Sequence, residues 1–303
     1  MKVLIATPAY GGVVHTAYHE SVLRTVQFFA DEFPGIRFES KIISISLLSA
    51  ARNVLASIVL NDPSYTHLLF IDADMGFAPS LIAKMLAFRK PVVGIVAPAK
   101  RMDHEAFYRA RSTCGSSVAA RLIANEYVAG DGALVGKRNA DGSEEIDIVD
   151  GFARVTHTGT GIMLIERKVL EIMRDRFADL WMVNPPERVR GFGLRAGGFF
   201  QCFEPLRDKD GLALGEDISF CLRWVNDCQG EIWANVDEGI AHVGSEAYAG
   251  QYLAKLKSRP SLKINMISLS ESASIVPPAA SDPDERRLTR KERRAMRHAR
   301  TSP

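Results

Sequence analysis

The sequence has few cysteines and no long apolar run, and both absences limit what the protein can be. Its four cysteines, at positions 114, 202, 221 and 228, show no CxxC or similar metal-type pairing. No run of about 18 or more apolar residues exists, so no membrane span is expected. The start, MKVLIATPAY, has too short an apolar run for a signal peptide. We therefore expect a cytoplasmic protein whose thiols are reduced.

The chain also lacks a strong bias of charge. Its formal net charge is +2, but residues 281–303 hold eight Lys/Arg and four Asp/Glu, which gives +4 there and −2 for the body. The body therefore lacks the basic bias of a nucleic-acid-binding protein, and no such partner is expected. The basic tail is either a solvated terminus or a segment that brings the protein into peripheral contact with the anionic inner face of the membrane.

Composition and length fit one globular domain with a tail. The chain has 303 residues, of which 47% are hydrophobic and 24% are charged. No internal repeat is present. From about residue 271 the chain turns to Ser, Ala, Pro and charge, which is typical of disorder. We expect a single domain over residues 1–270 and a disordered, basic tail over 271–303.

Apolar runs and helical periodicities alternate over the first hundred residues. Four strands are expected, at 3–7, 36–44, 66–72 and 91–98. Between them lie a helix that ends at Pro34-Gly35, a helix over 47–60 and a helix that begins at Pro79. This alternation predicts an α/β fold with a mostly parallel sheet and helices on both faces.

The pattern becomes looser after residue 100. Residues 101–160 mix charge, glycine and alternating segments, which favours antiparallel strands and loops. Residues 161–177 predict a strand that continues into a helix, and 217–228 predict a further helix. Residues 181–205 are rich in Gly, Pro and Arg and predict a long loop, a feature that often forms a lid. Two late strands are expected at 231–236 and 239–244.

The third strand ends in two carboxylates, Asp72 and Asp74, in the stretch FIDADMGF. In open parallel sheets, ligands bind outside the carboxyl ends of the strands. Hard cations such as Mg²⁺ and Mn²⁺ take oxygen ligands and often combine one or two carboxylates with substrate phosphates. The alternative is that these residues only cap the next helix. We expect the two side chains to serve different partners, with one Asp reaching a metal and the other reaching a neighbouring part of the ligand.

Two further sites add chemistry. Glu216 and Asp217 occupy the first turn of an amphipathic helix, where they could cap the helix or supply a general base that stays ionised at neutral pH. His242 follows a short apolar run and is either structural or a ligand for a divalent cation. Gly244, close by, permits another backbone to approach.

Six segments in order resemble the GT-A-fold glycosyltransferases, enzymes that use nucleotide sugars, and are similar to the family-two-like group. The segments are ATPAYGG, SAARN, FIDADMGF, TGTGIMLIER, GEDISFCLRW and IWANVDEGIAHVG, which together span residues 3–250. The resemblance implies a Rossmann-like central sheet with a smaller antiparallel subregion on the acceptor side. It also implies a nucleotide-binding half at 1–100 and an acceptor and catalytic half at 101–270.

The resemblance also implies roles for individual residues. The donor nucleotide sugar would contact the first loop, the basic residue of the second helix, the D-x-D turn and the TGTG segment: Thr7, Pro8, Ala9, Tyr10, Arg52, Asp72, Ala73 and Gly161. Asp74, His242 and Asp72 would form the site for Mn²⁺ or Mg²⁺, with Asp74 and His242 on the ion and Asp72 reaching it through a bound water or contacting the ribose. Asp217 would be the catalytic base of an inverting reaction, supported by Glu216.

The implied reaction moves a hexosyl or N-acetylhexosaminyl group from a UDP- or GDP-sugar to a hydroxyl of a glycan or lipid-linked acceptor. Surface polysaccharide synthesis is the expected setting. Arg188, Arg190 and Arg195 could close over the diphosphate, or could lie in a solvated loop. The segment 101–150 matches no pattern, and acceptor recognition could reside there.

Two other functions share these features. A nucleotidyltransferase that makes a nucleotide sugar would use a similar sheet and metal, but its first loop usually carries Arg or Lys. Here none occurs between the first strand and Arg24. A non-catalytic protein that binds sugar nucleotides would not need Asp72, Asp74, Asp217 and His242 together.

Overall fold

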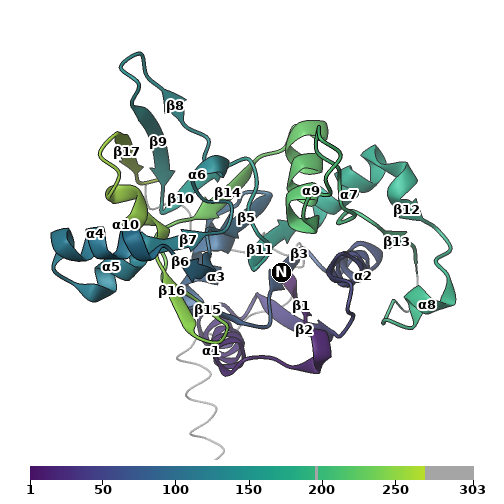
Figure 1. Ribbon diagram of the computed structural model, residues 1–303. Coiled ribbons are helices and arrows are strands. Elements are labelled where there is room, and N and C mark those ends of the chain that lie inside the picture. The colour runs from purple at the N-terminus through teal and green to yellow at the C-terminus, as the bar shows by residue number, and fades with distance from the viewer. Residues whose placement is uncertain (195–196, 270–303) are drawn as a thin grey trace, which may run out of the picture.

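The computed structural model describes residues 1–194 and 197–269, and a large mixed sheet lies at its centre (Figure 1). Nine strands follow one another across the sheet, and β8 (Lys137–Arg138) pairs with β9 beside them. In spatial order they are β17 (Leu262–Ile267), β9 (Glu144–Val149), β10 (Phe152–Val155), β14 (Ile232–Asn235), β5 (Val92–Ile95), β11 (Ile162–Glu166), β3 (His67–Ile71), β1 (Lys2–Pro8) and β2 (Arg37–Ile43).

Most strands of this sheet run in one direction. β1 is parallel to both β2 and β3, β14 is parallel to β5, and β17 is parallel to β9. β11 lies antiparallel between β3 and β5, and β10 lies antiparallel between β14 and β9. The predicted mostly parallel α/β sheet is therefore present, with strands from the second half of the chain inserted among those of the first.

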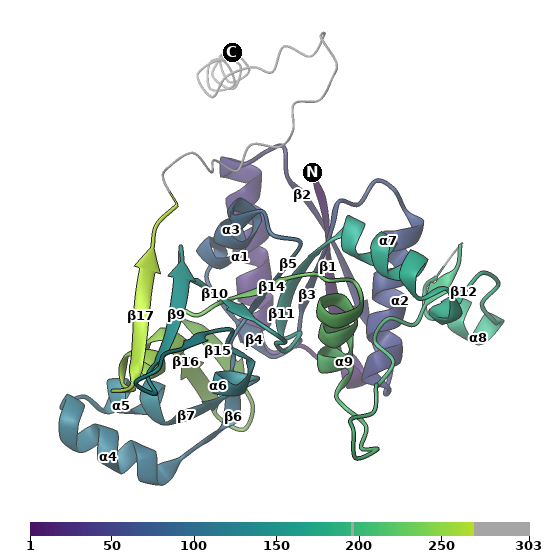
Figure 2. The same ribbon diagram turned by 90° about the horizontal axis from the view of Figure 1, so that it is seen from above.

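Helices cover both faces of the sheet (Figure 2). α1 (Thr16–Glu32) and α3 (Pro79–Phe88) pack on one face, and α2 (Leu48–Asn61), α7 (Arg167–Arg176) and α9 (Glu216–Leu222) pack on the other. Because helices cover both faces, β1 is apolar on both sides. Its Val3 and Ile5 belong to the apolar cluster that includes α1 and α3, and its Leu4 and Ala6 belong to the cluster that includes α2, α7 and α9.

A stripe of polar side chains on α2, buried at Asn53 and Ser57 and half-buried at Asn61, fixes the segment 198–204. Asn53, Ser57 and Asn61 are spaced by four residues and so share one face of the helix. Asn53 accepts from the Phe203 N–H at 2.8 Å, Ser57 Oγ accepts from a backbone N–H of the segment at 2.8 Å, and Asn61 donates to a backbone carbonyl at 2.7 Å. The segment leads towards α9, so this stripe positions the helix that begins with Glu216.

The expectation of only strands and loops over 101–160 is wrong for residues 104–124. Two helices, α4 (His104–Cys114) and α5 (Ser117–Ala124), lie there between β6 (Pro98–Met102) and β7 (Asn125–Tyr127). Their start signals are present: the Asp103 side chain accepts from the Ala106 N–H at 3.0 Å, and Ser116 caps α5 similarly. Both helices are short, and α4 in particular is rich in polar residues, so neither gave a clear apolar periodicity.

Short elements complete the described chain, several of them inside the long loop predicted at 181–205. They are η1 (Tyr10–Gly12), β4 (Met75–Gly76), α6 (Gly130–Ala133), η2 (Ala178–Leu180), β12 (Trp181–Met182), α8 (Glu187–Arg190), β13 (Phe199–Phe200), η3 (Arg223–Asp227), β15 (Ile240–Val243), β16 (Ala247–Gly250) and α10 (Tyr252–Lys257). In residues 1–194 and 197–269, no helix has the length and apolar character needed to cross a membrane. The tail predicted at 271–303, with its membrane contact, lies outside the described residues.

We expect His67, at the start of β3, to make the stability of the protein depend on pH. Burial, together with the charge of the N-terminal amine, lowers the pKa of His67 from 6.5 to about 4. Between these values the unfolded chain binds a proton that the folded chain lacks, so the free energy of unfolding falls as the pH falls. At pH 5 the loss should be about 1–2 kcal/mol relative to pH 7. Urea unfolding at both pH values should show a smaller loss for His67→Gln, and equal losses would contradict this assignment.

Candidate active site

A cavity of about 270 Å³ lies at the carboxyl ends of β3 and β5. Its walls come from α2, the turn after β3, the end of β5, residues 159–161, the start of α9 and β15. The side chains and backbone that matter most for its chemistry are those of Arg52, Asp72, Gly161, Glu216, Asp217 and His242. Residues from both halves of the chain therefore meet at the edge where the sequence predicts a ligand site.

The D-x-D segment is a tight turn that directs its two carboxylates to different partners. The Asp72 N–H donates to the Gly161 carbonyl at 2.8 Å, and the Met75 N–H donates back to the Asp72 carbonyl at 3.1 Å. The Val243 N–H then donates to the Asp74 carbonyl at 2.9 Å, which fixes the turn to β15. As a result Asp72 lies with Arg52, whereas Asp74 lies with His242.

Arg52 connects three parts of the site. Its side chain is 2% exposed, and its Nη2 donates to the two carboxylate oxygens of Asp72 at 3.0 and 3.2 Å. Its Nε donates to Glu216 Oε1 at 3.1 Å. Burial alone would lower the pKa of Arg52, but the charges of the two carboxylates raise it, so the guanidinium stays charged. Nη1 is buried without a hydrogen-bond partner in the described part of the chain.

Asp74 and His242 face each other at the side of the cavity. His242 Nδ1 lies 2.8 Å from the Pro98 carbonyl, which can only accept, so Nδ1 carries a hydrogen. In the neutral imidazole, Nε2 is then an acceptor, and it lies 3.5 Å from Asp74 Oδ1. Two acceptor atoms at this distance need a shared cation, either a proton on Nε2 or a metal ion.

The protonation behaviour of this pair agrees with a shared cation. Burial disfavours the charged form of Asp74, but hydrogen bonds from His242 and Lys100 hold its pKa at about 2. Burial likewise opposes the charged form of His242, but the hydrogen bond to Asp74 raises the pKa of the imidazole. Asp74 is therefore a carboxylate at neutral pH.

The residues present fit a divalent cation bound by two protein ligands. The 3.5 Å between Nε2 and Oδ1 is shorter than two metal–ligand bonds of about 2.1 Å laid end to end. The Pro98 carbonyl fixes the imidazole orientation, as such partners do at metal sites. Asp72, the third predicted ligand, instead pairs with Arg52. Accordingly, no group of three His, Cys, Asp or Glu side chains that could hold a metal occurs among the described residues.

Glu216 and Asp217 lie at the start of α9, on the cavity wall. Asp217 Oδ1 accepts from the Ile218 N–H at 2.7 Å. Burial and then the charge of Glu216 raise the pKa of Asp217 above 3.8. The sequence indicates a carboxylate kept ionised by the helix start, but in the structure burial acts in the opposite direction. A raised pKa makes Asp217 a stronger proton acceptor.

The residues predicted to hold the nucleotide base and ribose do not line this cavity. The Thr7 hydroxyl is fully buried and lies 2.7 Å from the Tyr18 hydroxyl. Pro8 and Ala9 are buried, whereas Tyr10 is 79% exposed on η1. The Ala73 carbonyl accepts from a backbone N–H of the segment before α1. Of this group only Tyr10 presents a free side-chain surface beside the carboxyl edge.

The two described arginines of the loop at 181–205, Arg188 and Arg190, do not line the cavity. Arg188 is exposed, and Arg190 Nε donates to the Pro185 carbonyl of its own loop at 3.2 Å. Arg195, the third arginine of the predicted lid, lies outside the described residues. The lid therefore stays a prediction.

Lys100 is a residue of the site that the sequence patterns missed. It lies on β6, and its Nζ is 2.5 Å from Asp74 Oδ2. The signal that could have identified it is its position directly after the fourth predicted strand, at the same sheet edge as the D-x-D turn.

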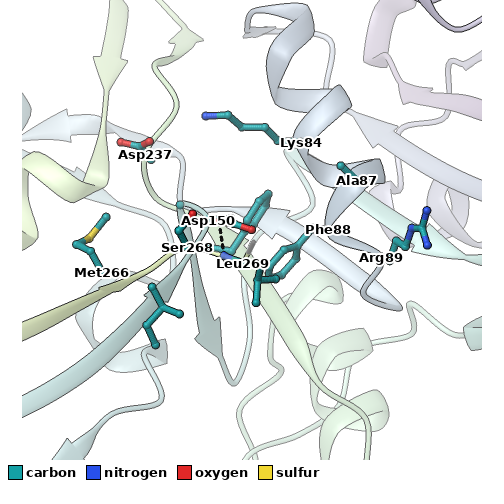
Figure 3. Close-up of a pocket in the computed structure, with 12 residues that line it drawn as sticks. Lys84, Ala87, Phe88, Arg89, Asp150, Asp237, Met266, Ser268 and Leu269 are labelled. Carbon is teal, nitrogen blue, oxygen red and sulfur yellow. Dashed lines mark hydrogen bonds between the residues drawn. The ribbon is translucent and has the colours of Figure 1, made fainter. Parts of the chain in front are cut away.

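A larger hollow of about 660 Å³ lies between the end of α3 and β17 (Figure 3). Much of its lining is apolar, including Phe88 and Met266, and Asp150 accepts from the Leu269 N–H at 3.0 Å, the dashed line in that view. None of the predicted site residues lines it. We therefore place the candidate active site in the smaller cavity, where carboxylates converge with the basic side chains of Arg52 and His242.

Comparisons with known proteins leave the family open. No protein-family model matches this sequence, and no curated protein matches it. Among solved structures, A197 from STIV aligns over 80% of this chain and 86% of its own, with 16% sequence identity and a TM-score of 0.39. That likeness is too distant to support an argument about fold family or function.

Proposed function

We propose that the chain is a metal-dependent, GT-A-like glycosyltransferase that moves a sugar from a nucleoside-diphosphate sugar to a hydroxyl acceptor with inversion. The observation that carries this proposal is the facing pair of Asp74 Oδ1 and His242 Nε2 beside a cavity whose wall also carries Asp217. A cation-binding pair and a buried carboxylate next to one cavity are the two groups that this reaction requires.

The charge balance of the site supports a divalent cation. When ionised, the four carboxylates of Asp72, Asp74, Glu216 and Asp217 face the two permanent cations Arg52 and Lys100. Two negative charges remain unbalanced, and a divalent cation would neutralise them. Such a cation, held by Asp74 and His242, supplies Lewis-acid stabilisation of the negative charge that develops on the leaving diphosphate.

In the proposed step, the acceptor oxygen forms a bond to the anomeric carbon as the bond from that carbon to the diphosphate oxygen breaks. The nucleoside diphosphate leaves with the electron pair, and Asp217 takes the proton of the acceptor hydroxyl. Partial burial and the charge of Glu216 raise the pKa of this carboxylate, which favours proton acceptance. Arg52 holds Asp72 and Glu216 in place around the cavity.

Thermal unfolding in the presence of UDP, GDP, CDP or ADP, each with and without Mn²⁺, tests the proposal. We expect one nucleotide to raise the melting temperature only when Mn²⁺ is present, because ligands that bind the folded state stabilise it by mass action. At about 100-fold excess over its dissociation constant, the ligand should add about 2.7 kcal/mol.

The matched control is Asp74→Asn, which keeps the shape of the side chain and removes its charge. This variant should lose the Mn²⁺-dependent shift. The absence of a shift with any nucleotide in the native protein would contradict the proposed donor site, and an equal shift without Mn²⁺ would contradict the metal.

A further inference from the structure

Lys100 and the proposed metal would use the same carboxylate. Asp74 Oδ2 lies 2.5 Å from Lys100 Nζ, while Asp74 Oδ1 faces His242 Nε2. Both side chains of the ion pair keep contact with solvent, with exposures of 38% for Lys100 and 24% for Asp74. The ammonium is therefore positioned like a cation bound to Asp74, yet it is free enough to move away.

The surrounding backbone accommodates the lysine in this position. A Cβ at Gly244 would lie 2.9 Å from Lys100 Cδ, so the lysine stem packs against this glycine and would have to shift if a side chain were present there. Lys100 and Pro98, whose carbonyl holds His242, belong to the same strand, β6. One strand thus positions both the imidazole and the ammonium around Asp74.

We propose that Lys100 is an internal competitor for the cation site, so that a divalent cation binds well only together with the diphosphate of the donor. This inference rests on the proposed function. Without donor, the ammonium neutralises Asp74 and repels a divalent cation from the same carboxylate. When donor arrives, its phosphates offer the ammonium another anionic partner, and Asp74 becomes free to bind the metal.

This arrangement makes Lys100 a positioning residue for donor and metal rather than a structural ion pair. Partly exposed ion pairs contribute little to folding stability, so the variants below should stay folded. The variants should therefore differ in metal affinity and not in melting temperature.

Titration of Mn²⁺ without nucleotide, followed by the electron paramagnetic resonance signal of free Mn²⁺, tests the proposal. Lys100→Met should bind Mn²⁺ more tightly than the native protein by about 10-fold to 100-fold, because the repulsion between the ammonium and the divalent cation is removed. Lys100→Arg should bind as weakly as the native protein, because it keeps the charge. Gly244→Ala should also tighten binding, because the new methyl group displaces the lysine stem.

Lys84→Met is the matched control, since Lys84 pairs with Glu238 in a different ion pair and should leave Mn²⁺ affinity unchanged. Equal Mn²⁺ affinity in Lys100→Met and the native protein would overturn the competitor role.

A second titration, in the presence of each nucleoside diphosphate, separates this failure from failure of the proposed function. Mn²⁺ binding to the native protein only with a nucleotide, and to Lys100→Met with or without it, supports both proposals. Nucleotide-dependent Mn²⁺ binding with no gain in Lys100→Met leaves the glycosyltransferase proposal standing and overturns the role of Lys100. No Mn²⁺ binding to any variant under either condition overturns both.

Discussion

Replacing Asp217 with asparagine is expected to lower the rate of sugar transfer by about 10²- to 10⁴-fold, the usual contribution of a general base. The amide has nearly the same shape as the carboxylate and can still accept from the Ile218 N–H. Donor and Mn²⁺ should therefore bind the variant as they bind the native protein. The release of nucleoside diphosphate, measured with the acceptor that gives the fastest turnover, is the readout.

The dependence of the rate on pH distinguishes a base from a merely structural carboxylate. Because the pKa of Asp217 is raised, the native rate should fall as the pH falls through that value, and Asp217→Asn should lack this acid limb. Asp31→Asn, an exposed position on α1, serves as the control and should behave like the native protein. Native-like turnover in Asp217→Asn would show that another group accepts the proton.

Replacing Arg52 with methionine is expected to lower the free energy of unfolding by about 3 kcal/mol, near the lower end of the cost of breaking a buried ion pair. The methionine fills part of the space but leaves Asp72 and Glu216 without their shared cation. Asp72 keeps 29% of its side-chain exposure and Glu216 keeps 18%, so water relieves part of the cost. Urea unfolding at neutral pH measures the change.

A triple variant separates charge from packing at this position. Arg52→Met combined with Asp72→Asn and Glu216→Gln removes the two unpaired charges and should recover most of the lost stability. If the triple variant is as unstable as the single one, the loss comes from packing around Arg52 and not from the carboxylates. Arg24→Met, in an exposed ion pair with Glu20, should change stability by no more than about 1 kcal/mol.

The main strands and helices of the first hundred residues could be predicted because each follows from the pattern of apolar residues within its own segment. The apolar run at 66–72 gives β3 (His67–Ile71), and the periodic segment 47–60 gives α2 (Leu48–Asn61). The helices α4 and α5 were missed because both are short and α4 in particular is rich in polar residues. Local caps at Asp103 and Ser116 were the signals available.

Candidate site residues could be identified from the sequence, but their partners could not. Asp72 and Asp74 follow a strand, Asp217 lies in the first turn of a helix and His242 lies in a short late strand, and such positions are visible in the pattern. The Arg52–Glu216 bond joins residues 164 positions apart, so no local pattern encodes it. The pairing of Lys100 with Asp74 and the raised pKa of Asp217 also depend on which segments meet and on how deeply they are buried.

The insertion of β11 between β3 and β5 constrains how the protein can fold during synthesis. When residues 1–100 have left the ribosome, β1, β2 and β3 can pair, but β5 has neither of its neighbours, β11 and β14. Val92, Val93 and Ile95 of β5 are buried in the finished sheet, and both neighbours of β5 are available only after residue 235 has emerged. At about 5–20 residues per second this wait lasts on the order of 10 s. Until then one apolar strand of the nascent chain lacks part of its final packing, as is typical of sheets built from contacts distant in the sequence.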